Sequence, residues 1–173
     1  NFPVQDTKNI DIMMETGTDK TFTFIKTIFE LSKHFGYKKF IILVPTVPIR
    51  EGTKTNLEDT KDYFKSLYAN EKEKEIETFV YEGGNISAVK QFIGTSHLSV
   101  LIMTPSSFNS KDNILNRPLE REMYAPELFL NNQEPPKSYL ECLKRLNPIV
   151  IMDEPHRFEG NAFKTYFEGF ENY

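Results

Sequence analysis

Two short segments of the chain carry residue types that could do phosphate chemistry. The first, residues 14–21, reads Met-Glu-Thr-Gly-Thr-Asp-Lys-Thr and follows an apolar run at residues 10–13. The second, residues 153–156, reads Asp-Glu-Pro-His and follows an apolar run at residues 148–152. A loop ending in Lys-Thr suits nucleotide phosphates, and an Asp-Glu pair after a strand suits metal binding and water activation. Together the segments predict the two halves of a nucleoside-triphosphate site.

The first segment is expected to act as a phosphate-binding loop. Backbone N–H groups of such a loop point at phosphate oxygens, and the helix that follows adds the positive end of its dipole. The Lys20 ammonium would reach the β and γ phosphates, and the Thr21 hydroxyl would bind Mg²⁺. Alone, this pattern would favour a polar turn between a strand and a helix. The Asp-Glu pair later in the chain makes ancestry from a nucleotide site the better interpretation.

Asp19 departs from this pattern, which has Gly at that position because the backbone must approach the phosphate closely. A carboxylate about 4–5 Å from a phosphate charge costs on the order of 3–4 kcal/mol at an effective dielectric constant of about 20. The residue therefore predicts weak ATP binding. The alternative is that the side chain turns outward and that a weakened binding survives.

The second segment divides its chemistry among several side chains. Asp153 would hold Mg²⁺, because a hard cation prefers carboxylate oxygen. Glu154 would polarise the attacking water, and His156 could sense the γ phosphate. An isolated Asp-Glu pair after a strand would more simply favour a helix N-terminus. His34 and His97 lack such neighbours in the sequence, and we expect both to be structural or surface residues.

Composition sets limits on the class of protein. The length of 173 residues suits one domain with a real core, and the hydrophobic content of 39% predicts a soluble chain. No run approaches the ~20 apolar residues of a membrane span, and no secretory signal is visible. Cys142 is the only cysteine, which excludes an internal disulfide. We expect a cytoplasmic protein, and its net charge of −4 means that any nucleic-acid contact must use local basic groups.

The apolar patterns alternate between strand and helix along the chain. The expected strands are residues 10–13, 39–44, 76–81, 98–103 and 148–152. The expected helices are residues 20–35, 57–68, 85–93, 137–145 and 161–170. The charge run at 71–75 predicts a solvated connection, and the polar stretch at 106–136 predicts a long mobile or functional loop. This order predicts an α/β fold, a parallel sheet with helices on both faces and ligands at the carboxyl ends of its strands.

The chain resembles a known family through residues 14–21, the strand end at 44–52, and the sequence Asp-Glu-Pro-His-Arg-Phe at 153–158. These segments look like the restriction (Res) subunit of type III restriction-modification enzymes, and the resemblance runs over essentially the whole chain. It implies that residues 1–173 are a single RecA-like P-loop NTPase domain, the first motor domain of a superfamily-two helicase-like ATPase. We expect a fragment of a longer protein, without the second motor domain and the nuclease domain.

The resemblance also implies site residues, cofactors and partners. The nucleotide-binding residues would be Thr16, Gly17, Thr18, Asp19, Lys20, Thr21 and His156. Lys20 and Glu154 would be catalytic, and Thr21 and Asp153 would bind the metal. The DNA-contacting residues would be Thr46, Arg50, Ser106 and Asn109. The cofactors would be ATP and Mg²⁺, and the partners double-stranded DNA and the methyltransferase and specificity (Mod) subunit. The parent protein would be an ATP-dependent type III site-specific deoxyribonuclease.

Two other functions stay open. An inert interaction module derived from a P-loop protein would keep the fold without using ATP, and Asp19 favours that interpretation. The motor domain of another superfamily-two DNA helicase, such as a repair helicase, is the other alternative. The Pro-His-Arg-Phe sequence at residues 155–158 argues against it.

Overall fold

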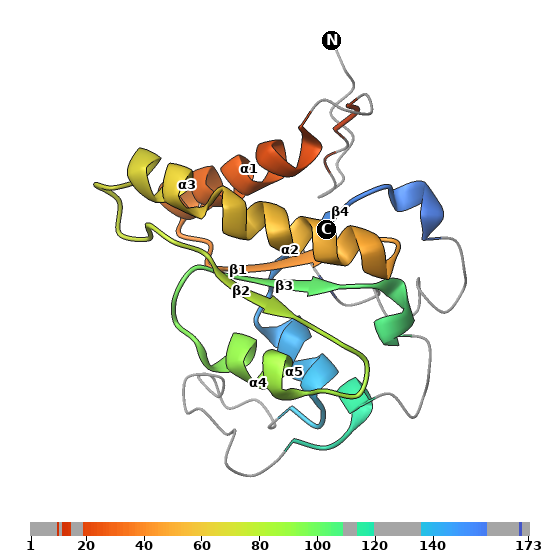
Figure 1. Ribbon diagram of the computed structural model, residues 1–173. Helices are drawn as coiled ribbons and strands as arrows, with labels where there is room; N and C mark the ends of the chain where they lie inside the picture. Colours follow the sequence, from red (N-terminus) through yellow and green to blue (C-terminus); the bar gives the residue numbers. More distant parts are fainter. Residues whose placement is uncertain are drawn as a thin grey trace.

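The core of the protein is a parallel sheet. The computed structural model describes residues 10, 12–14, 19–108, 114–119, 136–158 and 170. Its sheet has four strands in the order β2-β3-β1-β4, and every pair is parallel (Figure 1). The strands are β1 (Lys39–Leu43), β2 (Glu77–Val80), β3 (Ser99–Met103) and β4 (Ile149–Met152). The predicted α/β class is confirmed.

The two central strands are apolar on both faces, as strands covered by helices on each side must be. All of β3 is buried, and β1 is buried from Phe40 onward. The register sets Phe40 beside Val100 on β3 and beside Ile149 on β4. In the described part of the chain, β2 and β4 are the edges of the sheet.

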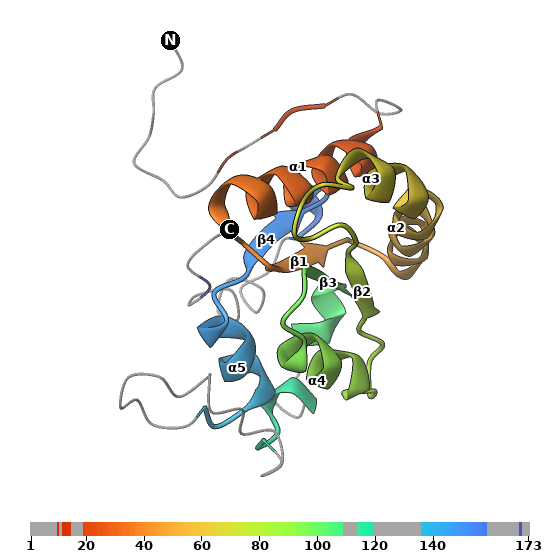
Figure 2. The ribbon, with the colours of Figure 1, turned by 90° about the vertical axis from the view of Figure 1, so that its left-hand side faces the viewer.

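Helices cover both faces of the sheet (Figures 1 and 2). The upper layer in these views holds α1 (Lys20–Phe35), α2 (Val47–Asp59) and α3 (Lys61–Leu67). The lower layer holds α4 (Ser87–Gly94) and α5 (Tyr139–Arg145). Two apolar clusters fill the spaces between these layers and the sheet. In the upper cluster, the Phe29 ring stacks on Phe64 at 5.3 Å and on Tyr68 at 4.6 Å.

Local signals explain where two of these helices begin and end. Gly36 ends α1 with a φ of 75°, and its N–H donates to the Ser32 carbonyl at 2.9 Å. Ser138 begins α5 by accepting a hydrogen bond from the Glu141 N–H at 3.2 Å. The Glu141 carboxylate accepts in turn from the Lys137 N–H at 2.7 Å, an arrangement close to a capping box.

The predicted strand at residues 10–13 is wrong. Ile10, Ile12 and Met13 have no regular structure and are 86%, 64% and 98% exposed. The strand that follows α1 is β1, and both of its edges already pair, with β3 and with β4. Residues 10–13 therefore cannot pair with β1, because both sides of that strand are already occupied.

Two further expectations change in detail. The predicted helix at 57–68 is the end of a longer stretch, in which α2 already starts at Val47 and Thr60 separates it from α3. Pro48 in the first turn of α2 is compatible with a helix start, because a proline there costs no helical hydrogen bond. The predicted helix at 161–170 lies outside the described residues except for Phe170.

The charge run at residues 71–75 is more than a solvated connection. Its acidic residues pair with lysines of the upper layer and with the lysine that directly precedes β1. The ion pairs join Glu71 to Lys33 at 3.1 Å, Glu73 to Lys38 at 3.0 Å, and Glu75 to Lys61 at 2.9 Å and to Lys65 at 2.5 Å. Much of the predicted loop at 106–136 lies outside the described residues. Its described parts include the short 3₁₀ turns η1 (Pro105–Phe108) and η2 (Ile114–Asn116).

Cys142 belongs to α5 and lies in the lower apolar cluster with 1% exposure. Burial raises the pKa of its thiol to about 11. In the described ranges, no helix is long and apolar enough to cross a membrane.

Candidate functional site

The end of β4 fixes the backbone of the second sequence segment. Asp153 directly follows β4, and its N–H donates to the Leu43 carbonyl at the end of β1, at 2.9 Å. This bond continues the parallel pairing of β1 with β4 by one residue. The Asp153 carboxylate is thereby held at the carboxyl edge of the sheet, where parallel α/β proteins bind ligands.

The structure brings Lys20 and Asp153 to the same edge of the sheet. Lys20 is the first residue of α1 and is partly buried. Burial raises the pKa of the Asp153 carboxyl, and the neighbouring Glu154 charge raises it further, while Lys20 acts in the opposite direction and leaves the pKa raised overall. Lys20 and Asp153, which are separated by more than half of the chain, are therefore close enough for their charges to interact. Lys20 and its successor Thr21 lie in the first turn of the helix.

Asp19 occupies a backbone conformation that favours glycine. It precedes α1 with φ 51° and ψ 43°, in the left-handed region, and its exposed side chain makes no capping bond. The backbone carbonyl of Asp19 accepts a hydrogen bond from the Thr23 N–H at 3.1 Å. The pattern of residues 14–21 indicated the close approach to phosphate, but not this second reason for a glycine at position 19.

Glu154 is also held in the left-handed region, with φ 52° and ψ 57°. Its Oε2 lies 2.8 Å from the Arg157 Nε, yet this oxygen is buried and makes no hydrogen bond to the described residues. The contact between Arg157 and Glu154 is therefore an ion pair whose geometry does not meet that of a hydrogen bond. Strained residues of this kind gather at functional sites. The third described non-glycine residue with positive φ, Asn147, lies before the other end of β4.

A short turn sets the spacing of the residues after Glu154. The Arg157 N–H donates to the Glu154 carbonyl at 2.9 Å, and the Phe158 N–H donates to the Pro155 carbonyl at 3.0 Å. The Phe158 ring is buried in the lower cluster, whereas His156 is exposed. Phe158 therefore anchors the turn. Arg157 is a site residue that only its place in the Pro-His-Arg-Phe motif indicated beforehand.

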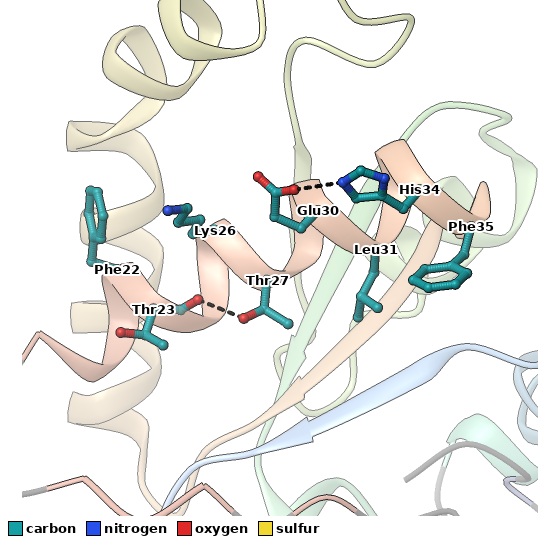
Figure 3. Close-up of a pocket in the computed structure, with 8 residues that line it drawn as sticks. All are labelled: Phe22, Thr23, Lys26, Thr27, Glu30, Leu31, His34 and Phe35. Carbon is teal, nitrogen blue, oxygen red and sulfur yellow. Dashed lines mark hydrogen bonds and ion pairs between the residues drawn. The ribbon is translucent and has the colours of Figure 1, made fainter.

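One groove in the described part of the chain does not lie at this edge. A shallow groove of about 530 Å³ runs along one side of α1 (Figure 3). Its lining comprises Phe22, Thr23, Lys26, Thr27, Glu30, Leu31, His34 and Phe35. The His34 Nε2 lies 3.1 Å from the Glu30 Oε2 in this groove. Because neither Lys20 nor Asp153 lines it, we place the candidate site by the chemistry of the strand ends and not by the groove.

The predicted DNA-facing residues divide into two kinds. Thr46 and Ser106 are exposed and follow the neighbouring strands β1 and β3, so that both lie at the carboxyl edge. The Ser106 hydroxyl is 2.7 Å from the Thr104 hydroxyl. Arg50 is buried, and its guanidinium donates to the Tyr81 carbonyl at 3.1 Å. Its role as a DNA contact stays a prediction, which this burial does not favour.

Several predicted site residues lie outside the described part of the chain. They are Thr16, Gly17, Thr18 and Asn109. Within the described ranges, no group of three or more His, Cys, Asp and Glu side chains is arranged to hold a metal ion. The described carboxylates at the site are Asp153 and Glu154, with Lys20 as the nearby cation.

Comparison of the sequence with known proteins assigns this chain to a family. The model of the family "Type III restriction enzyme, res subunit" matches residues 3–173. The Res subunit of the Escherichia coli type III enzyme EcoP15I is 36% identical over 164 residues, which cover 86% of this chain and 16% of that protein. The EcoPI Res subunit of Escherichia phage P1 is 37% identical with the same coverage. The StyLTI Res subunit of Salmonella typhimurium is 32% identical over 170 residues, with 88% and 16% covered.

The chain thus spans about a sixth of the length of these curated relatives. No solved structure matches it significantly. The family match covers both site segments, and the parallel α/β sheet agrees with the fold expected from the resemblance. The chain belongs to the family of type III restriction enzyme Res subunits, as a ResIII domain.

Proposed function

We propose that this chain is the ATP-binding first motor domain of a DNA-translocating type III restriction subunit. The observation that carries the proposal is the meeting of Lys20, at the start of α1, with Asp153, at the end of β4. Nucleotide-hydrolysing proteins need a cation for the phosphates and a carboxylate for the metal ion at one place. Family membership supports the same interpretation.

The residues at this edge fit Mg²⁺ and ATP. Burial and Glu154 both disfavour the charge on Asp153, and a bound divalent cation would relieve that penalty through carboxylate coordination. Asp153 and Thr21 would hold the metal, and Lys20 with Thr16, Gly17 and Thr18 would hold the phosphates. When bound, the metal would stabilise the charge of the phosphoryl group in transfer.

The remaining site residues would orient water and report on the nucleotide. Glu154 would orient the attacking water, because its buried Oε2 accepts no hydrogen bond from the described residues and can serve as an acceptor. Arg157 would hold the Glu154 side chain in place through its contact at 2.8 Å. His156, exposed beside them, would sense the γ phosphate. Asp19 would weaken ATP binding by repelling the phosphates and by adding bulk where the loop needs none.

Turnover would require more than this chain. Phosphoryl transfer needs charge stabilisation from groups that a second motor domain supplies, so we expect negligible DNA-stimulated ATPase activity from the chain alone. The relatives are Res subunits of restriction-modification enzymes. We propose double-stranded DNA and the Mod subunit as partners, an ATP-dependent type III site-specific deoxyribonuclease as the parent protein, and the cytoplasm as its compartment. Thr46, Ser106 and Asn109 would face the DNA.

Calorimetric titration with Mg-ATP tests this function. We expect weak binding by the natural sequence, no binding by Lys20→Ala, and an unchanged affinity for the control Lys26→Ala, an exposed lysine farther along α1. Asp153→Asn should weaken the magnesium dependence of binding. If neither the natural sequence nor Asp19→Gly binds Mg-ATP, the second candidate, an inert interaction module, becomes the better one, since Asp19 favours it.

A further inference from the structure

Arg50 is the one charged residue that is buried in the described part of the chain, with 8% exposure. It lies in the first turn of α2, just beyond the carboxyl end of β1. Burying a guanidinium is unfavourable unless its N–H groups and its charge find partners. The sequence suggests a phosphate contact for such a residue, but the burial calls for a partner within the protein.

The partners of Arg50 lie on two separate segments. Its Nη1 donates to the Tyr81 carbonyl at 3.1 Å. Its Nε and Nη2 donate to the Glu51 Oε1 at 3.0 and 2.8 Å, and Nη2 also lies 3.5 Å from the Glu82 Oε1. The planar guanidinium serves these acceptors in different directions at once, which a lysine ammonium on a flexible stem does less well.

These contacts cross the sheet. Tyr81 follows β2, whereas Arg50 comes after β1, and β3 lies between these two strands. The beginning of α2 therefore reaches past the end of β3, where Thr104 and Ser106 follow the strand. Tyr81 is itself fixed, with 1% exposure and an N–H that donates to the Ile102 carbonyl at 3.0 Å. Arg50 thus joins a helix start to a rigid point two strands away.

We infer that Arg50 is a positioning residue that ties the start of α2 to the turn between β2 and α4. It does not contact nucleic acid itself. It holds the segments after β1, β2 and β3 as one surface, on which Thr46 and Ser106 are the exposed polar residues. The link of this surface to DNA rests on the proposed function, but the tie between the two segments does not.

Hydrogen exchange of backbone amides tests the tie directly. Arg50→Met and Arg50→Lys should both speed exchange by about tenfold or more in residues 47–51 and also in residues 81–86, because both variants lose the bridging fork. Lys54→Met is the matched control: it removes one positive charge from the same helix, but this lysine is only partly buried and has a 3.9 Å ion pair with Glu58. The control should leave residues 81–86 unchanged.

Two outcomes of this experiment would overturn the inference. If Arg50→Lys exchanges its amides at the same rates as the natural sequence, a single positive charge is sufficient and the guanidinium does not tie the two segments together. Faster exchange confined to α2 in both Arg50 variants would mean that the two segments are not coupled. Arg50→Lys retains the charge, so it keeps the test decisive if Arg50→Met does not fold.

The salt dependence of duplex DNA binding separates positioning from direct contact. A positioning role predicts that Arg50→Lys weakens binding at every salt concentration, with the same slope of log K against log salt as the natural sequence. A phosphate contact predicts natural binding by Arg50→Lys and a slope smaller by about one for Arg50→Met. If the natural sequence binds no duplex, the proposed function fails, and the exchange result alone decides the role of Arg50.

Discussion

At the amino ends of the strands, Lys38 pairs with Glu73 and Lys39 donates to carbonyls. At the carboxyl ends, Asp153 and Glu154 are neighbours, and the buried Glu154 Oε2 accepts no hydrogen bond from the described residues. Lys38 is 3.0 Å from the Glu73 Oε1 and donates to the Ser96 carbonyl at 3.0 Å. Glu73 also accepts from the Leu98 N–H at 3.2 Å. The amino edge is thus built for stability.

Lys39 links the amino edge of the sheet to the lower layer. Its Nζ donates to the Phe92 and Thr95 carbonyls, each at 2.5 Å, and lies 4.8 Å from the centre of the Phe92 ring. These carbonyls belong to the end of α4, where a cation is favourable. Burial lowers the pKa of Lys39 to about 8, against the pull of Glu77. The contacts tie β1 to the helix below it.

The carboxyl edge has the opposite character. Asp19 and Glu154 hold left-handed backbone conformations there, and the buried Glu154 Oε2 accepts no hydrogen bond from the part of the chain that the structure describes. The raised pKa of Asp153 means that its charge is disfavoured in the folded chain. Groups held at a cost are characteristic of sites that await a ligand. Burial also disfavours the charge of Lys39, but its ammonium has two carbonyl acceptors, so the contrast between the edges lies in the Glu154 acceptor that no described residue satisfies.

The largest expected effect on ligand binding is on nucleotide affinity at the carboxyl edge. Asp19→Gly should tighten Mg-ATP binding by at least ~10-fold, or about 1.4 kcal/mol, because it removes both charge and bulk and suits the positive φ. Asp19→Asn keeps the bulk and removes the charge, so its affinity separates repulsion from steric exclusion. Calorimetry at one salt concentration measures all three forms, with Asp62→Asn, an exposed residue of α3, as the control. Equal affinities would contradict this account of the loop.

The largest expected effect on stability is at the amino edge. Lys39→Met should lower the free energy of unfolding by about 2 kcal/mol, because it leaves the Phe92 and Thr95 carbonyls without their donor. Urea unfolding of this variant and of Lys72→Met, which alters an exposed lysine of the charge run, makes the comparison. If Lys39→Met lowers the free energy of unfolding no more than the control does, Lys39 does not stabilise the amino edge.

Glu73→Gln should lower stability at neutral pH by about 1 kcal/mol. Burial acts to raise the pKa of Glu73, but the Lys38 ammonium and the Leu98 N–H outweigh it and lower the pKa overall. A lowered carboxyl pKa stabilises the fold above the unfolded-state pKa of about 4.3, and this stabilisation is lost as pH falls through the folded-state value. The difference between Glu73→Gln and the natural sequence should therefore shrink as urea unfolding is repeated from pH 7 toward pH 4.

The smallest effect should have the opposite sign. Asp153→Asn should raise the free energy of unfolding at neutral pH by about 0.5–1 kcal/mol, since it removes a disfavoured charge. A raised pKa gives a contribution that is complete below the unfolded-state value and lost as pH rises through the folded-state value. The advantage of the variant should accordingly vanish in acid. A destabilised Asp153→Asn at pH 7 would remove the contrast between the edges.

The periodicity of the sequence was sufficient to predict β1 to β4, because buried parallel strands are continuous apolar runs bounded by turn residues. The same signal misled at residues 10–13, since an apolar run carries no information about whether an open strand edge is near. The start of α2 was missed because Pro48 follows Pro45 and Thr46, and such a cluster favours a loop until the helix start is seen.

At the site, the motifs predicted Lys20 and Asp153, whose residue types are fixed by the chemistry. The partners of Arg50 could not be predicted, because Tyr81 and Glu82 approach it only through the order of the strands. The alternating ion pairs of Glu71, Glu73 and Glu75 were equally invisible, as a charge run gives no indication of which lysines lie opposite.

The burial of Cys142 makes the chain convenient for labelling. A buried thiol with a pKa of about 11 is almost entirely protonated at neutral pH and reacts slowly with alkylating reagents. A cysteine introduced at an exposed position such as Lys72 would therefore take a fluorophore selectively, without removal of the natural one. The rate at which Cys142 itself is alkylated would report how often α5 separates from the sheet. The single cysteine thus gives a measure of local opening in the lower layer.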